Sequence, residues 1–537
     1  MNHHGLIFSL IELSYPEDHH WVAQPVRSYG SHKIASHMRD EGWDVEVVDF
    51  FAFWTLDELK SLVDSRITKD TKFIGFSVLF FTMWHTMHKQ HELCKYVRKY
   101  YPWVTFISGG NKFASITNMV SDYYVAGFGE YAMQHLCNYL AGYGPKPIIR
   151  TTTPTLAQVE SGVFLNKTYS VILATDDYPA YPKVHVKTSF ENRDFLEPEE
   201  TVTTELSRGC RFACPFCNYA PLGVKGDHSR SADDFESEMR ENYDKWGITN
   251  YLLSDETIND YTEKLEKYGK VVQSLPFSPK FHGFLRADLL ISRGEREWDA
   301  CINMNLVGHH YGIETFNHDS GKIIGKGMHP DRMKAGLLYM DDYMTRNTPH
   351  YHAVSQTLIV GLPNETMNSL KQTAKWYCEE YPNRFVEFNE YVIQNDEENE
   401  LDHRADFEKQ ENLYKWIPSP ESMTKLVDNR WRGGHWLDNR TKDWKFSRQK
   451  IWEHPSGEYN EEDARLFCID FRKKLAAARG LKRQYAAASI WQLPYVTVLK
   501  RDPRNIWNPK RLGSFPPNSR HLWGKLMSRY KRAKLSL

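Results

Sequence analysis

TVTTELSRGCRFACPFCNYAP, residues 201–221, joins a β-rich run to a loop that holds three of the chain's eight cysteines. Threonine and valine dominate the first part, which predicts a strand. Gly209 lets the backbone turn sharply out of that strand, and Pro215 keeps the loop from continuing as a helix. The stretch therefore predicts a ligand site directly after a strand.

Similar strands recur after this one at intervals that leave room for helices. Six successive βα units predict a full or partial (βα)6 barrel over residues 201–400, with its chemistry at the carboxyl ends of the strands. The expected strands are TVTTELSRG (201–209), ITNYLLSDE (248–256), KFHGFLRAD (280–288), LVGHHYGIE (306–314), VSQTLIVGLP (354–363) and RFVEFNEYVI (384–393).

Residues 1–145 show the same alternation on a shorter period. Four nearly continuous apolar runs lie at 5–13, 44–51, 73–81 and 104–110, with amphipathic helical stretches at 31–43 and 90–101. Such runs between helices predict a doubly wound parallel sheet, a Rossmann-like α/β domain. Residues 146–200, which contain prolines and a run of threonines, are expected to be a linker.

The C-terminal region, residues 401–537, is predicted to be mainly helical or irregular. From residue 421 onward it carries 26 Lys and Arg against 11 Asp and Glu, and tryptophans are interleaved with the basic residues, as in RWRGGHW (430–436) and KRDPRNIWNPKR (500–511). Basic residues neutralise phosphates and aromatic rings stack on bases, so DNA or RNA is one expected partner. A structural extension with a small aromatic core is the alternative.

The apolar content of the chain bears on where it works. Its longest apolar runs, 5–11 and 73–84, are shorter than the ~20 residues of a membrane helix. The opening residues lack the pattern of a signal peptide. We therefore expect a cytoplasmic protein with no membrane partner, in which thiols stay reduced and clustered cysteines act as metal or redox ligands.

Three thiols leave two chemistries open. A structural zinc site needs four ligands, and His228 is the nearest candidate for the fourth, but the spacing of Cys210, Cys214 and Cys217 is unusual for zinc. Three thiolates can instead hold three irons of a cubic iron–sulfur cluster, which leaves the fourth iron open to a ligand. The other five cysteines are scattered, so a second cluster is not expected.

The motif Cys210-x3-Cys214-x2-Cys217, with Phe216 before the last cysteine, resembles the radical S-adenosylmethionine (SAM) superfamily. LLSDETIND (252–260), FLRADLL (284–290), YGIETFNHDSGKIIGKG (311–327) and TLIVGLPNET (357–366) resemble further motifs of that family in its usual order. The resemblance implies a [4Fe–4S] cluster on the three cysteines and SAM on the open iron. It also implies reductive cleavage of SAM to a 5′-deoxyadenosyl radical, with electrons from a flavodoxin- or ferredoxin-type donor.

The resemblance also implies which residues surround SAM. The carboxylate of Glu314 could accept from a ribose hydroxyl or from the methionine ammonium. Asp255 and Arg286 could instead belong to internal ion pairs. The implied cofactor neighbours are Phe216, Ser254, Asp255, Arg286, Glu314, Gly361 and Pro363.

The N-terminal domain resembles the cobalamin-binding domains that precede many radical SAM barrels. The resemblance lies in residues 25–50, IGFS (74–77), ISGG (107–110) and VAGFGEYA (125–132). It implies cobalamin as a third cofactor, bound at the strand ends that carry Ser77, Gly109, Gly110 and Gly127. The motif Asp-x-His-x-x-Gly is absent from the sequence, so cobalamin binds without a histidine ligand or the domain is a scaffold.

Three functions remain open from the sequence. The first is modification of a nucleobase on or for nucleic acid, by rearrangement or carbon modification, as in the viral radical SAM isomerases of thymidine hypermodification, which would place the protein in a host cytoplasm. The second is cobalamin-dependent methyl transfer to a small molecule or peptide. The third, a non-enzymatic metal-binding protein, is disfavoured by the ordered motifs between Cys210 and Pro363.

Overall fold

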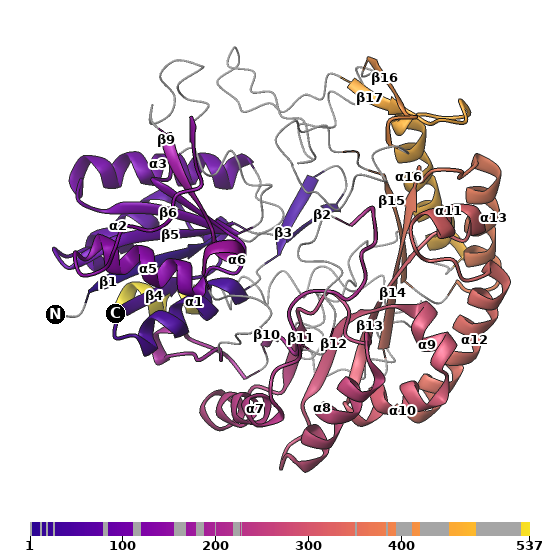
Figure 1. Ribbon diagram of the computed structural model, residues 1–537, viewed down its shortest axis with the longest axis horizontal. Helices are drawn as coiled ribbons and strands as arrows, with labels where there is room; N and C mark the ends of the chain where they lie inside the picture. The colour runs from indigo at the N-terminus through magenta and orange to yellow at the C-terminus, as the bar shows by residue number, and fades with distance from the viewer. Residues whose placement is uncertain are drawn as a thin grey trace. The chain divides into compact units, whose positions relative to one another are not determined.

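The chain folds into two compact units, residues 1–197 with 519–537 and residues 198–518 (Figure 1). This computed structural model describes residues 3–10, 13–17, 20–24, 27–78, 84–110, 120–154, 168–178, 187–198, 200–217, 226, 228–348, 352–382, 385–391, 393, 411–418, 450–478 and 528–537.

A seven-stranded sheet forms the centre of the first unit. Its strands lie in the order β4 (Asp44–Val48), β1 (His4–Ser9), β5 (Thr71–Val78), β6 (Thr105–Gly110), β7 (Tyr123–Ala126), β9 (Thr168–Leu173) and β8 (Thr151–Pro154). All neighbours pair in parallel except β8, which runs antiparallel to β9. A separate hairpin pairs β2 (Leu13–Glu17) with β3 (His20–Gln24).

Helices cover both faces of this sheet, as the doubly wound prediction requires. The helices α1 (Tyr29–Asp40) and α5 (Glu130–Leu140) share one apolar core with the sheet, and α2 (Leu56–Arg66) and α3 (Trp84–Tyr100) share the other. Ser28 begins α1 by accepting a hydrogen bond from the Ser31 N–H, and Thr55 begins α2 with a capping box to Glu58. The described residues of this unit also form the short helices η1 (Phe51–Phe53), α6 (Ala174–Asp177) and η4 (Asn192–Asp194).

The first unit is larger than the predicted domain of residues 1–145. The stretch 146–200, expected as a linker, contains β8 and β9, so its β-branched residues belong to the sheet. A helical stretch at 528–536 also joins this unit, with the Tyr530 ring buried in the core beside Phe50 and Trp54. Local sequence patterns cannot predict that second addition, because nearly 500 residues separate the partners.

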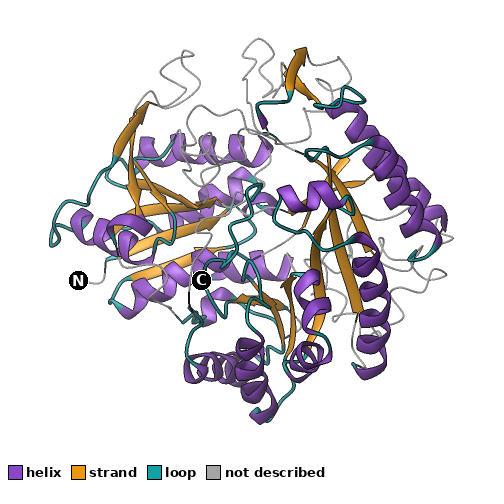
Figure 2. Cartoon of the chain, turned by 45° about the vertical axis from the view of Figure 1, so that its right-hand side comes forward, coloured by secondary structure: helices purple, strands orange, loops and turns teal. Residues whose placement is uncertain are grey.

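The second unit is built on six strands whose order in the sheet follows the chain. These are β10 (Thr201–Thr204), β11 (Asn250–Leu253), β12 (Lys280–Leu285), β13 (Leu306–Glu314), β14 (His352–Val360) and β15 (Phe385–Glu390). Every neighbouring pair is parallel, which confirms the partial (βα)6 barrel. Figure 1 shows these strands side by side, and Figure 2 shows the helices that flank the strands.

The helices of the second unit follow the strands in turn. Ser231 caps α7 by accepting from the Asp234 N–H, and Pro330 occupies the first turn of α12, where its missing N–H costs no hydrogen bond. The helices are α7 (Ala232–Trp246), α8 (Thr262–Ser274), α9 (Ala287–Arg293), α10 (Glu295–Asn303), α11 (His318–Ile323), α12 (Pro330–Asn347) and α13 (Met367–Glu379).

The described part of the C-terminal region adds a small hairpin and one helix to the barrel. The strands β16 (Lys415–Pro418) and β17 (Lys450–Glu453) pair in antiparallel fashion, and α16 (Glu461–Ala478) packs Phe471 against Phe388 of β15, with ring centroids 4.4 Å apart. The two motifs that prompted the nucleic-acid prediction, residues 430–436 and 500–511, lie outside the described residues.

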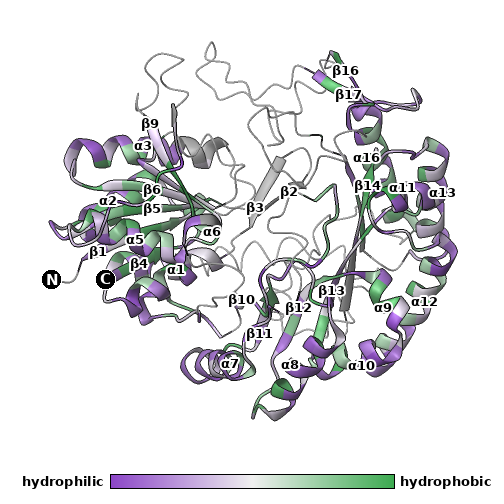
Figure 3. Ribbon diagram, viewed as in Figure 1, coloured by the Kyte–Doolittle hydropathy of each residue, from purple (hydrophilic) through white to green (hydrophobic). Residues whose placement is uncertain are grey.

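Hydropathy follows the same layers. Figure 3 shows hydrophobic residues concentrated in the strands of the first sheet and hydrophilic residues along the outer helices. Among the described helices, none has the length and apolar character needed to cross a membrane.

Candidate active site

The carboxyl ends of the six barrel strands carry most of the residues that the sequence singles out. Because the strands are parallel and in chain order, their ends share one edge of the sheet. The cysteine loop follows β10, Ser254 and Asp255 follow β11, Arg286 follows β12, Glu314 ends β13, and Gly361 follows β14.

The three cysteines of the loop come from one short turn. Cys210 is buried, whereas Cys214 and Cys217 are partly exposed, and none of the eight cysteines forms a disulfide. The Cys217 N–H donates to the Cys214 carbonyl at 3.0 Å, which fixes the turn that contains Pro215 and the half-buried Phe216. The Cys210 sulfur lies 3.4 Å from the Thr257 hydroxyl.

Asp255 anchors the start of this loop. Its carboxylate accepts hydrogen bonds from the backbone N–H groups of Leu206 and Ser207, both at 2.8 Å, and from the Ser207 hydroxyl at 2.7 Å. The Lys264 ammonium lies 3.7 Å away. Burial raises the pKa of Asp255, and Lys264 and these hydrogen bonds oppose that shift. The side chain predicted as a cofactor neighbour therefore holds the loop that carries the cysteines.

Arg286 connects the next strand end to the cysteines. Its guanidinium stacks over the Phe212 ring at 4.2 Å and places Nη1 3.8 Å from the Cys214 sulfur. Two further hydrogen bonds to Asp288, at 3.0 and 2.6 Å, fix its orientation. Burial raises the pKa of the Cys214 thiol, while Lys326 and Arg286 act to lower it. Arg286 therefore faces the cysteine loop and also forms the internal ion pair that was its alternative.

Glu314 ends β13 in a left-handed conformation with φ +67°. Its carboxylate oxygen Oε1 accepts from the Lys326 ammonium at 2.9 Å, and the same ammonium donates to the Gly312 carbonyl. Ser254, which follows β11, is exposed and donates from its hydroxyl to the Thr204 carbonyl at 3.2 Å. Both side chains lie at strand ends, where the prediction put them.

Sequence reasoning missed two charged residues at this edge. Glu256 follows Asp255 directly, and burial raises its pKa to about 7. Lys326 reaches Glu314 from the turn after α11. Glu256 could have been predicted from the run Ser254–Asp255–Glu256, since a strand end can present either of two adjacent carboxylates. Lys326 could not, because it lies twelve residues after Glu314 in an irregular turn and no sequence pattern links the two.

The chemistry of the three thiols fits an iron–sulfur cluster. All three cysteines are free and lie on one loop. Thiolates are the usual ligands of such clusters, and three of them leave one iron open.

The predicted ligand edge of the first unit is continuous across three strands. Ser77 pairs with Gly109, Val78 with Gly110, and Gly110 with Ala126, which precedes Gly127. The Ser77 hydroxyl lies 3.1 Å from the Ser28 hydroxyl. Gly110 has φ +133°, and a Cβ there would lie 1.9 Å from the Val78 carbonyl oxygen, so strand packing alone requires this glycine.

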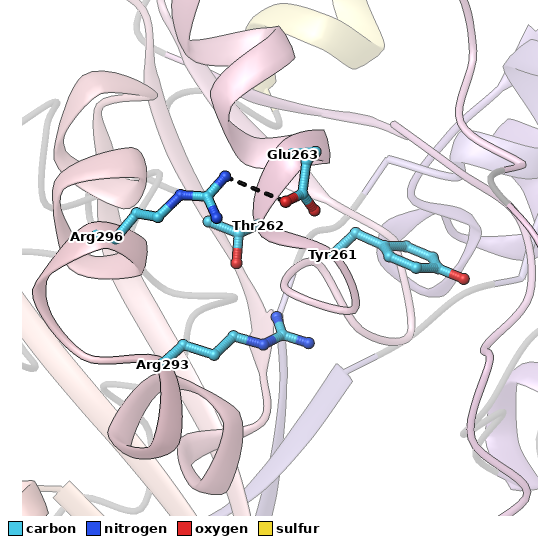
Figure 4. A pocket seen from close by; sticks show the side chains of 5 residues that line it. All are labelled: Tyr261, Thr262, Glu263, Arg293 and Arg296. Carbon is cyan, nitrogen blue, oxygen red and sulfur yellow. Dashed lines mark hydrogen bonds and ion pairs between the residues drawn. The ribbon is translucent and has the colours of Figure 1, made fainter.

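A polar hollow of about 330 Å³ is lined by residues from the start of α8 and from the helices α9 and α10 (Figure 4). Arg296 pairs with Glu263 at 3.1 Å across it, and Arg293 pairs with Glu297 and donates to the carbonyls of Asn259 and Asp260. Its charged groups are thus neutralised by neighbours. Tyr261 and Thr262 complete its lining.

The family of the barrel follows from comparison with known proteins. Residues 204–377 match the model of the radical SAM superfamily, and they span the cysteine loop and the first five strand ends. The chain therefore carries a radical SAM domain, a class of protein domain that uses a [4Fe–4S] cluster and SAM. No curated protein sequence matches the chain.

Comparison with solved structures shows which folds the chain shares. The cobalamin-dependent SAM radical enzyme OxsB, with aqua-cobalamin and SAM bound, matches with a TM-score of 0.52 at 14% identity over 76% of this chain and 55% of OxsB. The apo form of OxsB gives 0.51 over the same shares. At this identity the match shows the fold, and the chain spans about half the length of OxsB. Coproporphyrinogen III oxidase (HemN) from Escherichia coli, at 15% identity over 44% of this chain and 59% of that chain, has a TM-score of 0.30, too low to carry an argument.

Proposed function

We propose that the chain is a radical SAM enzyme whose cluster is held by Cys210, Cys214 and Cys217. The observation that carries the proposal is the cysteine loop at the end of β10, anchored by Asp255 and faced by Arg286. Bound together, the two cofactors supply one-electron reductive cleavage of SAM to a 5′-deoxyadenosyl radical. A flavodoxin- or ferredoxin-type protein is the proposed source of the electron.

The residues of the strand ends have different proposed roles. Asp255 keeps the loop in register, and Arg286 places positive charge beside a thiolate. Phe216, Ser254, Glu314 and the Gly361–Pro363 turn are the proposed SAM contacts. For Glu314 to bind a ribose hydroxyl or an ammonium group, its carboxylate must share or exchange its hydrogen bond from Lys326.

Anaerobic reconstitution tests the cluster assignment. Single Cys→Ala changes at positions 210, 214 and 217 should each abolish cluster assembly or production of 5′-deoxyadenosine. Cys301→Ala is the matched control, because Cys301 is buried on the helix α10 away from the loop. Retention of iron and of SAM cleavage in Cys210→Ala would show that the proposed ligand set is wrong.

Two reaction classes are proposed for the radical. Modification of a nucleobase is supported by the basic composition of residues 421–537. Cobalamin-dependent methyl transfer is supported by the small-residue edge at Ser77, Gly109, Gly110 and Gly127, and by the fold shared with OxsB. None of the comparisons bears on the thymidine isomerases, so that resemblance stays a hypothesis.

One assay separates these classes. Reconstituted protein, produced with cobalamin available, is incubated with SAM and reductant while bound cobalamin, methyl transfer and nucleic-acid binding are measured together. Copurified base-off cobalamin with methyl transfer supports the second class. Full SAM cleavage in cobalamin-free protein that binds nucleic acid supports the first and reduces the N-terminal domain to a scaffold.

A further inference from the structure

The turn after β14 has an unusual pattern of hydrogen bonds. Each of its five consecutive backbone carbonyls, from residue 361 to residue 365, accepts a hydrogen bond from a side chain. The donors are Tyr414 to Gly361 at 2.6 Å, His454 to Leu362 at 3.0 Å, Ser320 to Pro363 at 2.6 Å, Asn317 to Asn364 at 3.2 Å and Tyr459 to Glu365 at 3.4 Å.

Three of these donors come from the C-terminal region of the chain. Tyr414 precedes β16, and His454 and Tyr459 follow β17, so they lie 53 to 94 residues beyond the carbonyls that they bind. We call residues 411–418 and 450–460 the hairpin segment. The match to the radical SAM model ends at residue 377, so this segment lies outside the matched region.

The hairpin segment also packs a ring directly against the turn. Gly361 has φ +109°, and a Cβ there would lie 2.6 Å from the ring of Trp452. The Trp452 indole N–H donates to the Tyr391 carbonyl at 2.9 Å, at the end of the neighbouring strand β15. Trp452 is fully buried, and Tyr414 meets it edge to face with ring centroids 5.7 Å apart.

The protonation state of His454 follows from its two contacts. Its Nδ1 accepts from the Ser456 backbone N–H at 3.1 Å, so the proton resides on Nε2, which donates to the Leu362 carbonyl. Burial lowers the pKa of His454, which keeps the ring neutral near pH 7. The hydrogen bond to the turn is therefore a fixed feature of the folded state.

We propose that Tyr414, Trp452 and His454 are positioning residues that hold the Gly361–Pro363 turn in the conformation that receives SAM. This inference rests on the proposed function, which makes that turn a SAM contact. A carbonyl held by a side chain fixes the peptide plane on either side of it. A backbone fixed before binding loses less conformational freedom when a ligand docks, so the affinity for the ligand rises.

Tyr414→Phe tests the proposal with the smallest change. It removes one hydroxyl, keeps the ring beside Trp452, and leaves a buried carbonyl unsatisfied. We expect the dissociation constant for SAM on reconstituted protein to rise about 5- to 10-fold. Amide hydrogen exchange in a peptide covering 359–366 should also accelerate, and this readout does not require turnover.

Two substitutions of His454 distinguish the effect of its hydrogen bond from the effect of its size. His454→Phe fills the space without a donor and should behave like Tyr414→Phe. His454→Gln retains an N–H that can reach the Leu362 carbonyl and should recover most of the affinity. Tyr343→Phe is the matched control, because its hydroxyl bonds the exposed Asp299 on the far helices and its loss should leave SAM affinity unchanged.

The outcomes separate this inference from the function on which it rests. If wild-type protein assembles its cluster but binds no SAM, the proposed function fails and the inference fails with it. If the wild type binds SAM while Tyr414→Phe and His454→Phe leave both affinity and exchange unchanged, only the inference is overturned. Equal losses of affinity in His454→Phe and His454→Gln would also contradict it.

Discussion

Single residues at the barrel edge have structural roles that their sequence motifs do not predict. Asp255 belongs to a run that resembles a cofactor motif, yet its carboxylate is occupied by three hydrogen bonds from Leu206 and Ser207. A buried carboxylate in that position fixes the cysteine loop relative to the end of β11. Its effect on cofactors is expected to be indirect.

Asp255→Ala should therefore impair the loop before it impairs SAM binding. Removing the carboxylate leaves the buried N–H groups of Leu206 and Ser207 without their acceptor, which should lower the free energy of unfolding by about 3 kcal/mol. We expect a reduced iron content per chain, measured after reconstitution. A full iron content with weak SAM binding would instead make Asp255 a direct SAM ligand.

Glu365 predicts a pH dependence of stability. Burial raises its pKa to about 8 from an ordinary value of 4.5, so the folded state holds the proton more tightly than the unfolded state. The resulting stability is present below pH 4.5 and is lost as the pH rises through 8. Glu365→Gln cannot ionise but can still accept from the Thr315 hydroxyl, which bonds Glu365 at 2.8 Å.

The variant should gain stability over the wild type as the pH rises. The difference in unfolding free energy should grow by on the order of 3 kcal/mol between pH 5 and pH 9. Denaturant midpoints at several pH values measure it. A constant difference across that range would mean that Glu365 ionises normally.

At this scale the sequence predicted which residues stand at strand ends, because the βα alternation and the cysteine spacing are local patterns. It did not predict how those residues are used. Asp255, Arg286 and Glu314 each have partners from another element, namely the β10 loop, the cysteine turn and Lys326. Such pairings depend on the packed structure.

At the scale of elements, the helical stretch 528–536 changes how the C-terminal region is understood. Three of its basic residues pair with acids of the first unit: Arg529 with Glu197, Lys531 with Glu58 and Lys534 with Glu46. Lys534 is fully buried, and burial lowers its pKa while Glu46 raises it. These charges were counted in the basic excess that suggested a polyanionic partner.

Removing residues 528–537 should destabilise the first unit. The deletion exposes the site of the buried Tyr530 ring, removes its hydroxyl from the Asp49 N–H, and leaves Glu46 without its lysine. We expect a loss of about 3 kcal/mol or more in unfolding free energy, followed by the fluorescence of Trp54, whose ring lies 6.2 Å from Tyr530. Arg532→Ala, an exposed change in the same stretch, is the control.

Elements were predicted well where one period of hydrophobicity runs through them, as in the barrel strands. They were missed where the strand is short and ends in a proline, as β8 does, or where the partner is remote, as with residues 528–536. The role of the hairpin segment could not be predicted either, because the hydrogen bonds of Tyr414 and His454 to the turn after β14 are visible only in the folded structure.

At the scale of the whole molecule, the nucleic-acid proposal needs a test that leaves the first unit intact. Deleting residues 421–537 would remove Tyr530 and Lys534 with the basic residues. We instead expect Lys and Arg→Gln changes at Lys500, Arg501, Arg504, Lys510 and Arg511 to weaken binding of a mixed-sequence oligonucleotide while SAM cleavage continues.

The salt dependence of oligonucleotide binding gives a quantitative test of the nucleic-acid proposal. Four to six phosphate contacts predict a log–log slope of about −3 to −5 for the wild type, and the substituted protein should show a shallower slope. Affinity too weak to measure at ~50 mM salt would favour the methyl-transfer alternative. So would an affinity that does not change with salt.

The buried position of Tyr530 also sets an order of events during synthesis. The Asp49 N–H and the Tyr530 hydroxyl are 481 residues apart in the chain. At ribosomal speeds of roughly 5–20 residues per second, the first unit waits about 25–100 s for the residue that fills its core. We expect ribosome-bound chains halted near residue 500 to expose Phe50 and Trp54 to protease, and chains extended past residue 537 by a linker to protect them. The unit at the start of the chain is thus among the last to be completed.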